Sequence, residues 1–206
     1  MHRKLPQIFN LLDEVDTIII EQTKLDDRSI QSSSVYTIRN DNADDKNIAR
    51  VTEDAEDIIN TRNLTINDDN GKMVLMCEIE KINCLRNAMH IYSPSGFLLG
   101  TVKDRYFKWK ADYDICTGNQ NVMFLISLGS FASYLTIKMK QTNGKAVVAT
   151  VSPSHWQNGE VIYRINYLKK IPVLQKMLIL GQAVAYCQGL RRSRIFPNSN
   201  ILWRHK

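Results

Sequence analysis

The sequence predicts a mainly β protein, a twelve-stranded closed antiparallel barrel around a C-terminal hydrophobic helix, with a short N-terminal helix. Short apolar runs stop and restart at polar turns near Asn42, Asn70, Ser95, Asn119 and Asn143, at spacings of 28, 25, 24 and 24 residues. A near-constant spacing indicates one supersecondary unit used repeatedly, here a β-hairpin. Two further strand-like runs bracket these hairpins, and the most hydrophobic segment of the chain comes last.

The N-terminal part predicts a helix and then a strand. Between Leu5 and Val15 the apolar residues recur at helical spacing, and Pro6 is compatible with a first helical turn. Thr17 to Leu25 contains three consecutive isoleucines, which favour a strand. A polar stretch follows, and we expect a loop there.

Five hairpins are expected next. Asn70-Gly71 and Asn143-Gly144 are the strongest turn signals, because both central residues of a type I′ turn have positive φ. The expected strand pairs are Val35–Arg39 with Ile48–Thr52, Leu64–Ile66 with Met73–Glu78, Met89–Tyr92 with Leu98–Lys103, Tyr113–Cys116 with Val122–Ile126, and Leu135–Met139 with Ala146–Val151.

A last strand is expected from Val161 to Leu168, where two sets of residues alternate with a period of two. Five hairpins and the two outer runs make twelve strands, and closure into a barrel would remove their unpaired edges. About eight strands is the size at which side chains alone fill a barrel. A twelve-stranded barrel therefore needs something else in its interior.

The hydrophobic segment from Ile171 to Cys187 has two interpretations. A transmembrane helix needs about 20 predominantly apolar residues, and this segment contains Gln175, Lys176 and Gln182. A helix over residues 172–188 that plugs the barrel fits better, and both interpretations stay open at this point. The residues expected to form the plug or membrane helix are Val173, Leu174, Met177, Leu178, Leu180, Val184 and Ala185.

Composition predicts one globular domain over residues 1–190 and a basic tail over residues 191–206. The formal charge of +6 favours anionic surfaces, and charge alone does not choose between nucleic acid and phospholipid. No specific nucleic acid is predicted, although the basic tail also suits a nuclear signal. The residues expected to contact anionic lipid are Lys169, Lys170, Arg191, Arg192 and Arg194.

The sequence does not predict an enzyme or a metal site. Motifs of serine hydrolases, zinc proteases and P-loop proteins are absent from it. Its four cysteines, Cys77, Cys84, Cys116 and Cys187, are scattered without the spacing of a zinc site or a disulfide framework. We expect free thiols in a reducing cytosol.

Several motifs, in order, resemble the phospholipid scramblases of the tubby-like barrel superfamily. The resemblance extends from about Gln7 to Gly189. It rests on Leu11–Asp16 with the isoleucines that follow, Tyr36–Asn40 with Glu53-Asp54, Ile91–Gly96, Leu99–Val102, and Val151–Gly159 with its Trp156.

The resemblance implies a twelve-stranded barrel around a C-terminal helix, and ATP-independent, calcium-stimulated movement of phospholipids between leaflets. It also implies membrane association on the cytoplasmic side of the plasma membrane or of an organelle. The basic tail, independently of the resemblance, is compatible with a nuclear pool. The alternative is a non-transporting tubby-like module that binds phosphoinositides or a protein partner. Such a module would lose vesicle binding when the arginines of the basic tail are neutralised.

Two departures from the family pattern change what is expected. The family's palmitoylated cysteine cluster should fall near Cys84, where few cysteines remain, and one acyl chain gives only marginal membrane binding. The family's acidic calcium segment should lie between Gly159 and Pro172, where a single glutamate stands among cations. Calcium needs several oxygen ligands, so no calcium site is expected there.

Overall fold

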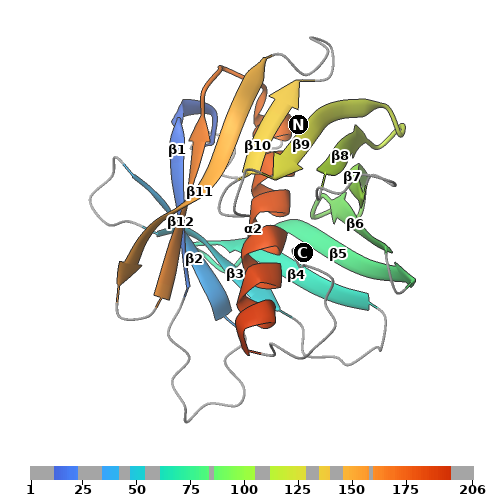
Figure 1. The fold of residues 1–206 in the computed structure, drawn as a ribbon. Helices are drawn as coiled ribbons and strands as arrows, with labels where there is room; N and C mark the ends of the chain where they lie inside the picture. Colours follow the sequence, from blue (N-terminus) through green and yellow to red (C-terminus); the bar gives the residue numbers. More distant parts are fainter. Residues whose placement is uncertain are drawn as a thin grey trace, which may run out of the picture.

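The computed structural model describes residues 12–22, 34–41, 47–53, 61–83, 86–104, 112–128, 135–139, 146–157 and 160–195. They form twelve strands and one long helix (Figure 1). The helix, α2, spans Val173–Ile195, and residues 12–14 form a helical turn before the first strand. The strands are β1 (Thr17–Gln22), β2 (Ser34–Asn40), β3 (Asn47–Glu53), β4 (Thr61–Asp68), β5 (Met73–Asn83), β6 (Arg86–Tyr92), β7 (Leu98–Asp104), β8 (Asp112–Thr117), β9 (Val122–Leu128), β10 (Leu135–Met139), β11 (Val147–Gln157) and β12 (Glu160–Tyr167).

The sheet is a closed antiparallel barrel in which each strand pairs with its neighbours in sequence. Closure occurs at β1, which pairs with both β2 and β12. Thr17 lies opposite Asn166 of β12, and Ile18 lies opposite Asn40 of β2. The predicted fold class is confirmed, and the five expected hairpins are the pairs β2–β3, β4–β5, β6–β7, β8–β9 and β10–β11.

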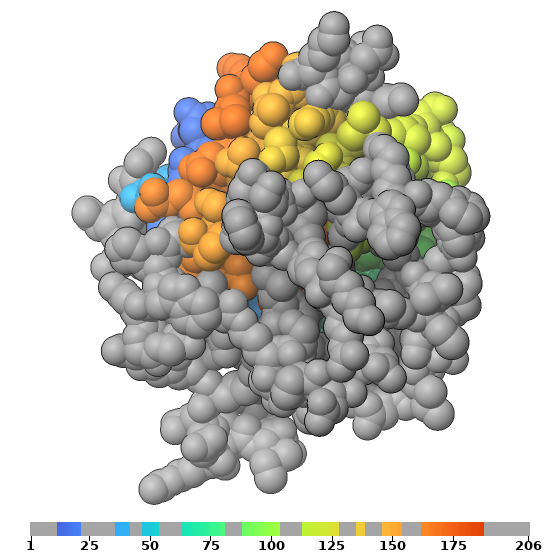
Figure 2. Space-filling model, viewed as in Figure 1, coloured from blue at the N-terminus to red at the C-terminus, as the bar shows by residue number. Residues whose placement is uncertain are grey.

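Helix α2 lies along the middle of the barrel. In Figure 1 it stands between β1, β2, β11 and β12 on one side and β5 to β9 on the other. The wall approaches it closely at Gly100 of β7, where an added Cβ would lie 2.9 Å from Cδ2 of Leu178. Figure 2 shows β9 to β12 as a continuous outer wall on this face of the molecule.

Alternation along each strand sends one set of side chains into the barrel. In β12, Tyr163, Ile165 and Tyr167 are buried, whereas Arg164 and Asn166 between them are only partly buried. Inward residues of the other strands join the same core as the helix. The predicted filling problem is therefore solved by α2, because inward side chains and the helix together form one hydrophobic cluster.

Three successive hairpin turns share a geometry that differs from the predicted one. In the turn after β4, the amide of Gly71 donates to the carbonyl of Asp68 at 2.9 Å, and positive φ occurs at Gly71 (74°) but not at Asn70. The turns after β6 and β8 repeat this arrangement with Gly96 (80°) and Gln120 (64°). These are type I turns followed by a residue in the left-handed region, so the predicted type I′ turn at Asn70-Gly71 is wrong.

The reason is local in the first of these turns. The Oδ1 atom of Asp68 accepts hydrogen bonds from the amides of Asn70 at 3.0 Å and Lys72 at 2.9 Å. An aspartate at the first turn position holds the following residues in a type I conformation. The second predicted type I′ turn, Asn143-Gly144, lies outside the described residues.

Helix α2 is longer than predicted: it continues to Ile195 instead of ending at residue 188. Leucine and arginine have high helix propensity, and cations near a helix C-terminus interact favourably with its dipole. Arg191, Arg192 and Arg194 therefore belong to the last turns of α2 rather than to a separate tail. The rest of that tail, residues 196–206, lies outside the described residues.

Candidate functional site: the end of the barrel where the helix enters

The chain enters the barrel interior at the end of β12, and we call this the helix-entry end. Because neighbouring strands are antiparallel, the start of β1 and the turns after β4, β6 and β8 lie at the same end. The helical turn at residues 12–14 precedes β1 there. The C-terminal turns of α2 point toward the opposite end, which we call the helix-exit end.

A buried lysine joins α2 to the N-terminal helical turn. Lys176, in the first turn of α2, is only 1% exposed. Its Nζ donates hydrogen bonds to the backbone carbonyls of Leu12 at 2.8 Å, Asp13 at 3.2 Å and Val15 at 2.7 Å. Carbonyls at the end of a helical turn have no partner within the helix, and lysine side chains are suited to bind them.

Tyr167, the last residue of β12, packs against the same lysine. Its ring centroid lies 5.1 Å from Nζ of Lys176, and its hydroxyl donates to the Lys176 carbonyl at 3.1 Å. The amide of Tyr167 donates to the carbonyl of Asp16 at 2.7 Å. The N-terminal turn, the end of β12 and the start of α2 are thus tied together at one point.

Opposing effects act on the charge of this lysine. Burial lowers the pKa of Lys176 from its usual value, and the carboxylates of Asp16 and Asp13 oppose that shift. Both carboxylate residues are exposed, whereas the ammonium is enclosed. The arrangement holds a buried cation through backbone carbonyls, which makes Lys176 a structural anchor rather than a reactive amine.

The segment from Leu168 to Leu174, here called the entry segment, is largely exposed. Leu168 is 57% exposed and Leu174 is 45% exposed, although both are apolar. Lys169 and Lys170, which stand between them, are also exposed. The entry segment thus presents two leucines and two lysines to the surroundings at the helix-entry end.

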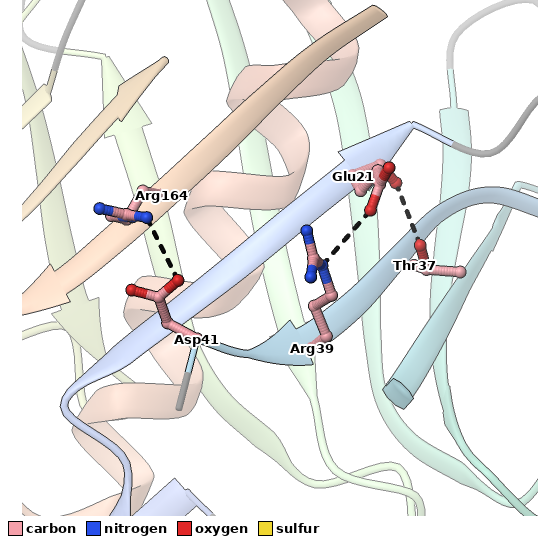
Figure 3. A network of polar contacts seen from close by, with 5 residues as sticks. All are labelled: Glu21, Thr37, Arg39, Asp41 and Arg164. Carbon is pink, nitrogen blue, oxygen red and sulfur yellow. Dashed lines mark hydrogen bonds and ion pairs between the residues drawn. The ribbon is translucent and has the colours of Figure 1, made fainter. Parts of the chain in front are cut away.

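Polar contacts cover the seam where the barrel closes (Figure 3). Arg39 and Glu21 form an ion pair at 3.4 Å between β2 and β1, and Arg164 of β12 reaches Asp41 at 3.2 Å. Thr37 also donates to the carbonyl of Glu21 at 3.5 Å. All of these side chains lie on the outer wall and are partly exposed, so the seam is a structural feature and not an enclosed site.

The predicted plug residues divide into two groups. Met177, Leu178, Leu180 and Val184 are buried in the core, as expected for a plug. Val173 and Ala185 are only partly buried. In contrast, Leu174 belongs to the exposed entry segment: it lies on the outward side of the first turn of α2, whereas Lys176 in the same turn is buried.

Sequence reasoning missed several members of the helix core. Ile179, Ala183 and Tyr186 are buried as well, and so is Lys176. A lysine within an apolar segment was a visible signal, since a buried cation requires partners. Its carbonyl partners lie more than 160 residues away in sequence, which local patterns do not reveal.

In the described part of the chain, no helix combines the length and the apolar composition needed to cross a membrane. No group of three or more His, Cys, Asp or Glu side chains is placed there to hold a metal ion. The residues expected to bind anionic lipid lie at both ends of α2. Lys169 and Lys170 precede the helix, and Arg191, Arg192 and Arg194 are in its last turns. The predicted palmitoylation site, Cys84, lies outside the described residues.

The described cysteines are free thiols and lie inside the protein. Cys77, Cys116 and Cys187 are all buried. Burial raises the pKa of Cys77 to about 12 and raises that of Cys187 well above its usual value. Thiols of this kind stay protonated and unreactive at neutral pH.

A surface hollow of about 250 Å³ lies beside the turn after β4. Its lining carries an arginine and two aspartates, so negative charge is in slight excess there. The lining residues are Arg50, Thr52, Asn67, Asp68, Asp69 and Gly71.

Comparison with known proteins gives a distant structural similarity, from which nothing further is concluded. No protein-family model matches the chain, and no curated protein matches its sequence. The X-ray structure of a protein from Arabidopsis thaliana is similar, with a TM-score of 0.49 and 15% sequence identity. The likeness covers 82% of this chain and 90% of that chain, and at this level it does not extend to function.

Proposed function

We propose that this protein binds the surface of anionic phospholipid membranes as a peripheral barrel module. The observation that carries the proposal is that α2 fills the barrel and has cationic residues at both of its ends. Lys169 and Lys170 precede the helix, and three arginines lie in its last turns. Each such residue near an anionic leaflet contributes about 1 kcal/mol to binding.

The resemblance to scramblases supports phospholipid as the ligand. Movement of a lipid between leaflets requires a path for its headgroup through about 30 Å of hydrocarbon. The interior of this barrel is filled by α2 and inward side chains, so binding at the outer surface is the activity that the geometry supports best. Transbilayer movement, with or without calcium, stays a prediction of the resemblance, as does a location on the cytoplasmic side of a membrane.

Vesicle co-sedimentation tests the proposal. We expect the purified chain to sediment with phosphatidylserine vesicles at low salt and to stay in solution with phosphatidylcholine vesicles. Binding should weaken as salt rises, because the Debye length falls from about 10 Å at 0.1 M to about 3 Å at 1 M. Absence of binding to anionic vesicles at low salt refutes the proposal.

The same vesicles separate binding from transport when they carry a fluorescent lipid. Faster exchange of that lipid between leaflets on addition of protein would assign scrambling activity, and calcium can be added or chelated in parallel. Binding with unchanged exchange would assign the non-transporting module. Binding to vesicles of pure lipid would show that membrane attachment needs no protein partner.

A further inference from the structure

The surface hollow beside the turn after β4 is lined by opposite charges that do not pair with each other. Its volume is about 250 Å³, and Arg50, Asp68 and Asp69 supply the charges of the lining. Within the described residues, no ion pair or hydrogen bond involves the side chain of Arg50 or of Asp69. The guanidinium and the carboxylates therefore border one space without closing it.

The neighbouring strands leave Arg50 without a carboxylate partner. On the β2 side it lies opposite Thr37, and on the β4 side it lies opposite Asn67, both of which are neutral. Glu21 of β1 lies beyond Thr37 and forms its ion pair with Arg39 (Figure 3). An exposed guanidinium between neutral neighbours is available to a ligand, and its planar fork suits a carboxylate or a phosphate.

Asn67 is oriented for a second contact. Its Nδ2 atom donates to Oγ1 of Thr52 at 3.4 Å, and that hydroxyl donates to the carbonyl of Thr65 at 3.5 Å. The Oδ1 atom of Asn67 has no partner in the described part of the chain, so it can accept a hydrogen bond from a ligand. Because Asn67 lies directly opposite Arg50, both side chains leave the same face of the sheet.

The turn after β4 supplies the negative side of the hollow. Oδ1 of Asp68 accepts hydrogen bonds from the amides of Asn70 and Lys72, which holds the turn in its conformation. Asp69 comes next and is exposed, so its carboxylate is available to a ligand. One cation thus faces two carboxylates, and the hollow attracts an ammonium group on its turn side and an anionic group beside Arg50.

We propose that this hollow binds a small zwitterion, in which an ammonium group and a carboxylate or phosphate are joined by a short carbon chain. Arg50 contacts the anionic group, and Asp69 with Oδ1 of Asn67 contacts the ammonium group. A simple anion would lie beside two carboxylates, and a simple cation would lie beside a guanidinium, so a molecule with both charges fits the lining best. A water molecule takes about 30 Å³, so the hollow has room for a ligand of roughly ten non-hydrogen atoms or fewer. The inference does not depend on the proposed membrane binding.

A titration followed by two-dimensional amide NMR spectra tests the proposal. The probes are glycine, β-alanine, γ-aminobutyrate and phosphoethanolamine, which differ in the length of the chain and in the anionic group. The best of them should bind with a dissociation constant on the order of 1 mM, as expected for a ligand of this size in an open site. The shifts should be confined to amides of the lining, such as those of Asn67 and Gly71.

Probes that carry only one of the two charges are the matched ligands. Methylamine, acetate and inorganic phosphate should each bind at least about tenfold more weakly than the best zwitterion, because linked groups bind as one unit. Preference for an amino carboxylate or for phosphoethanolamine identifies the anionic group, and either result supports the proposal. Equal affinity for a one-charge probe, or no shift in the lining with any zwitterion at about 50 mM, overturns it.

Variants assign the two contacts. Arg50→Gln and Asp69→Asn should each weaken binding of the best zwitterion by about tenfold, because each leaves one charge of the ligand without its partner. Lys72→Gln, in the same turn but outside the lining, should change binding by no more than about twofold. All three side chains are exposed, so the melting temperatures should be nearly unchanged. Unchanged affinity in Arg50→Gln or in Asp69→Asn refutes the assigned contacts.

Discussion

Replacement of Lys176 by methionine tests whether the buried cation holds the helix-entry end together. Methionine keeps a long apolar stem in the core but removes the donor that serves the carbonyls of Leu12, Asp13 and Val15. An unpaired buried carbonyl costs about 1–3 kcal/mol, so the loss of a donor that three carbonyls share costs about 3–5 kcal/mol in all. A hydrophobic replacement can offset this loss of stability only when both polar partners are replaced. Here the partners are backbone carbonyls, which no substitution removes.

For a chain of this length, 1 kcal/mol corresponds to about 2–4 °C in melting temperature. We therefore expect Lys176→Met to lower the melting temperature by roughly 6–20 °C. Lys170→Met is the matched control: that lysine is exposed, so the free energy of unfolding should change by no more than about 0.5 kcal/mol. Calorimetry or thermal circular dichroism measures both.

Amide hydrogen exchange locates the effect. The amide of Tyr167 is bonded to the carbonyl of Asp16, so it should lose protection in Lys176→Met if the N-terminal turn detaches. Amides in the middle of β9 should be affected only through global stability. A loss below about 1 kcal/mol, or unchanged protection at Tyr167, would refute the anchoring role of Lys176.

Three further predictions concern packing, titration and the barrel seam. Gly100→Ala should lose about 2 kcal/mol or more of its free energy of unfolding, measured with denaturant. The new Cβ would lie 2.9 Å from Leu178 and closer still to a backbone oxygen of β8. An alanine Cβ at Gly71 would have nothing within 4 Å, but the φ of +74° is strained for alanine, so Gly71→Ala should lose about 1 kcal/mol of its free energy of unfolding. If Gly100→Ala loses no more than Gly71→Ala, the helix does not pack tightly against β7. Between pH 9 and 11 the free energy of unfolding should fall by about 2 kcal/mol through Cys77, because its thiol ionises near pH 9 when unfolded but near 12 when folded; Cys77→Ala should show a shallower decline. Arg164→Ala should cost less than about 1 kcal/mol, since its ion pair in Figure 3 is partly exposed, and a loss above about 2 kcal/mol would give the seam a larger role.

The strands and their order were predictable because each is encoded locally. A period of two in residues such as Tyr163, Ile165 and Tyr167 identifies both the strand and its inward face. The turn type was not predictable from Asn70-Gly71 alone, since Asp68 two residues earlier determines the hydrogen bonds. The turn type depends on hydrogen bonds from neighbouring side chains to the backbone, as well as on which residues tolerate positive φ.

The candidate site was predicted in part. Lys169 and Lys170 were expected to contact anionic lipid from their place beside the hydrophobic segment, but Leu174 was expected on the plug or membrane helix. Its exposure depends on which side of the first helical turn faces away from the core, and that orientation follows from tertiary packing.

The sequence by itself determined the number of strands, their pairing as hairpins, and the need for a helix inside a barrel too wide for its own side chains. These features follow from the hydrophobic period along each strand, the spacing of the turns and the width of a twelve-stranded barrel. The first two are local in sequence, and the width follows from the number of strands. Only the tertiary structure decided that Lys176 binds the N-terminal carbonyls and that Leu174 is exposed. The first of these depends on closure of the barrel, which brings residues 149 and 161 positions apart into contact at the junction of β1, β12 and α2.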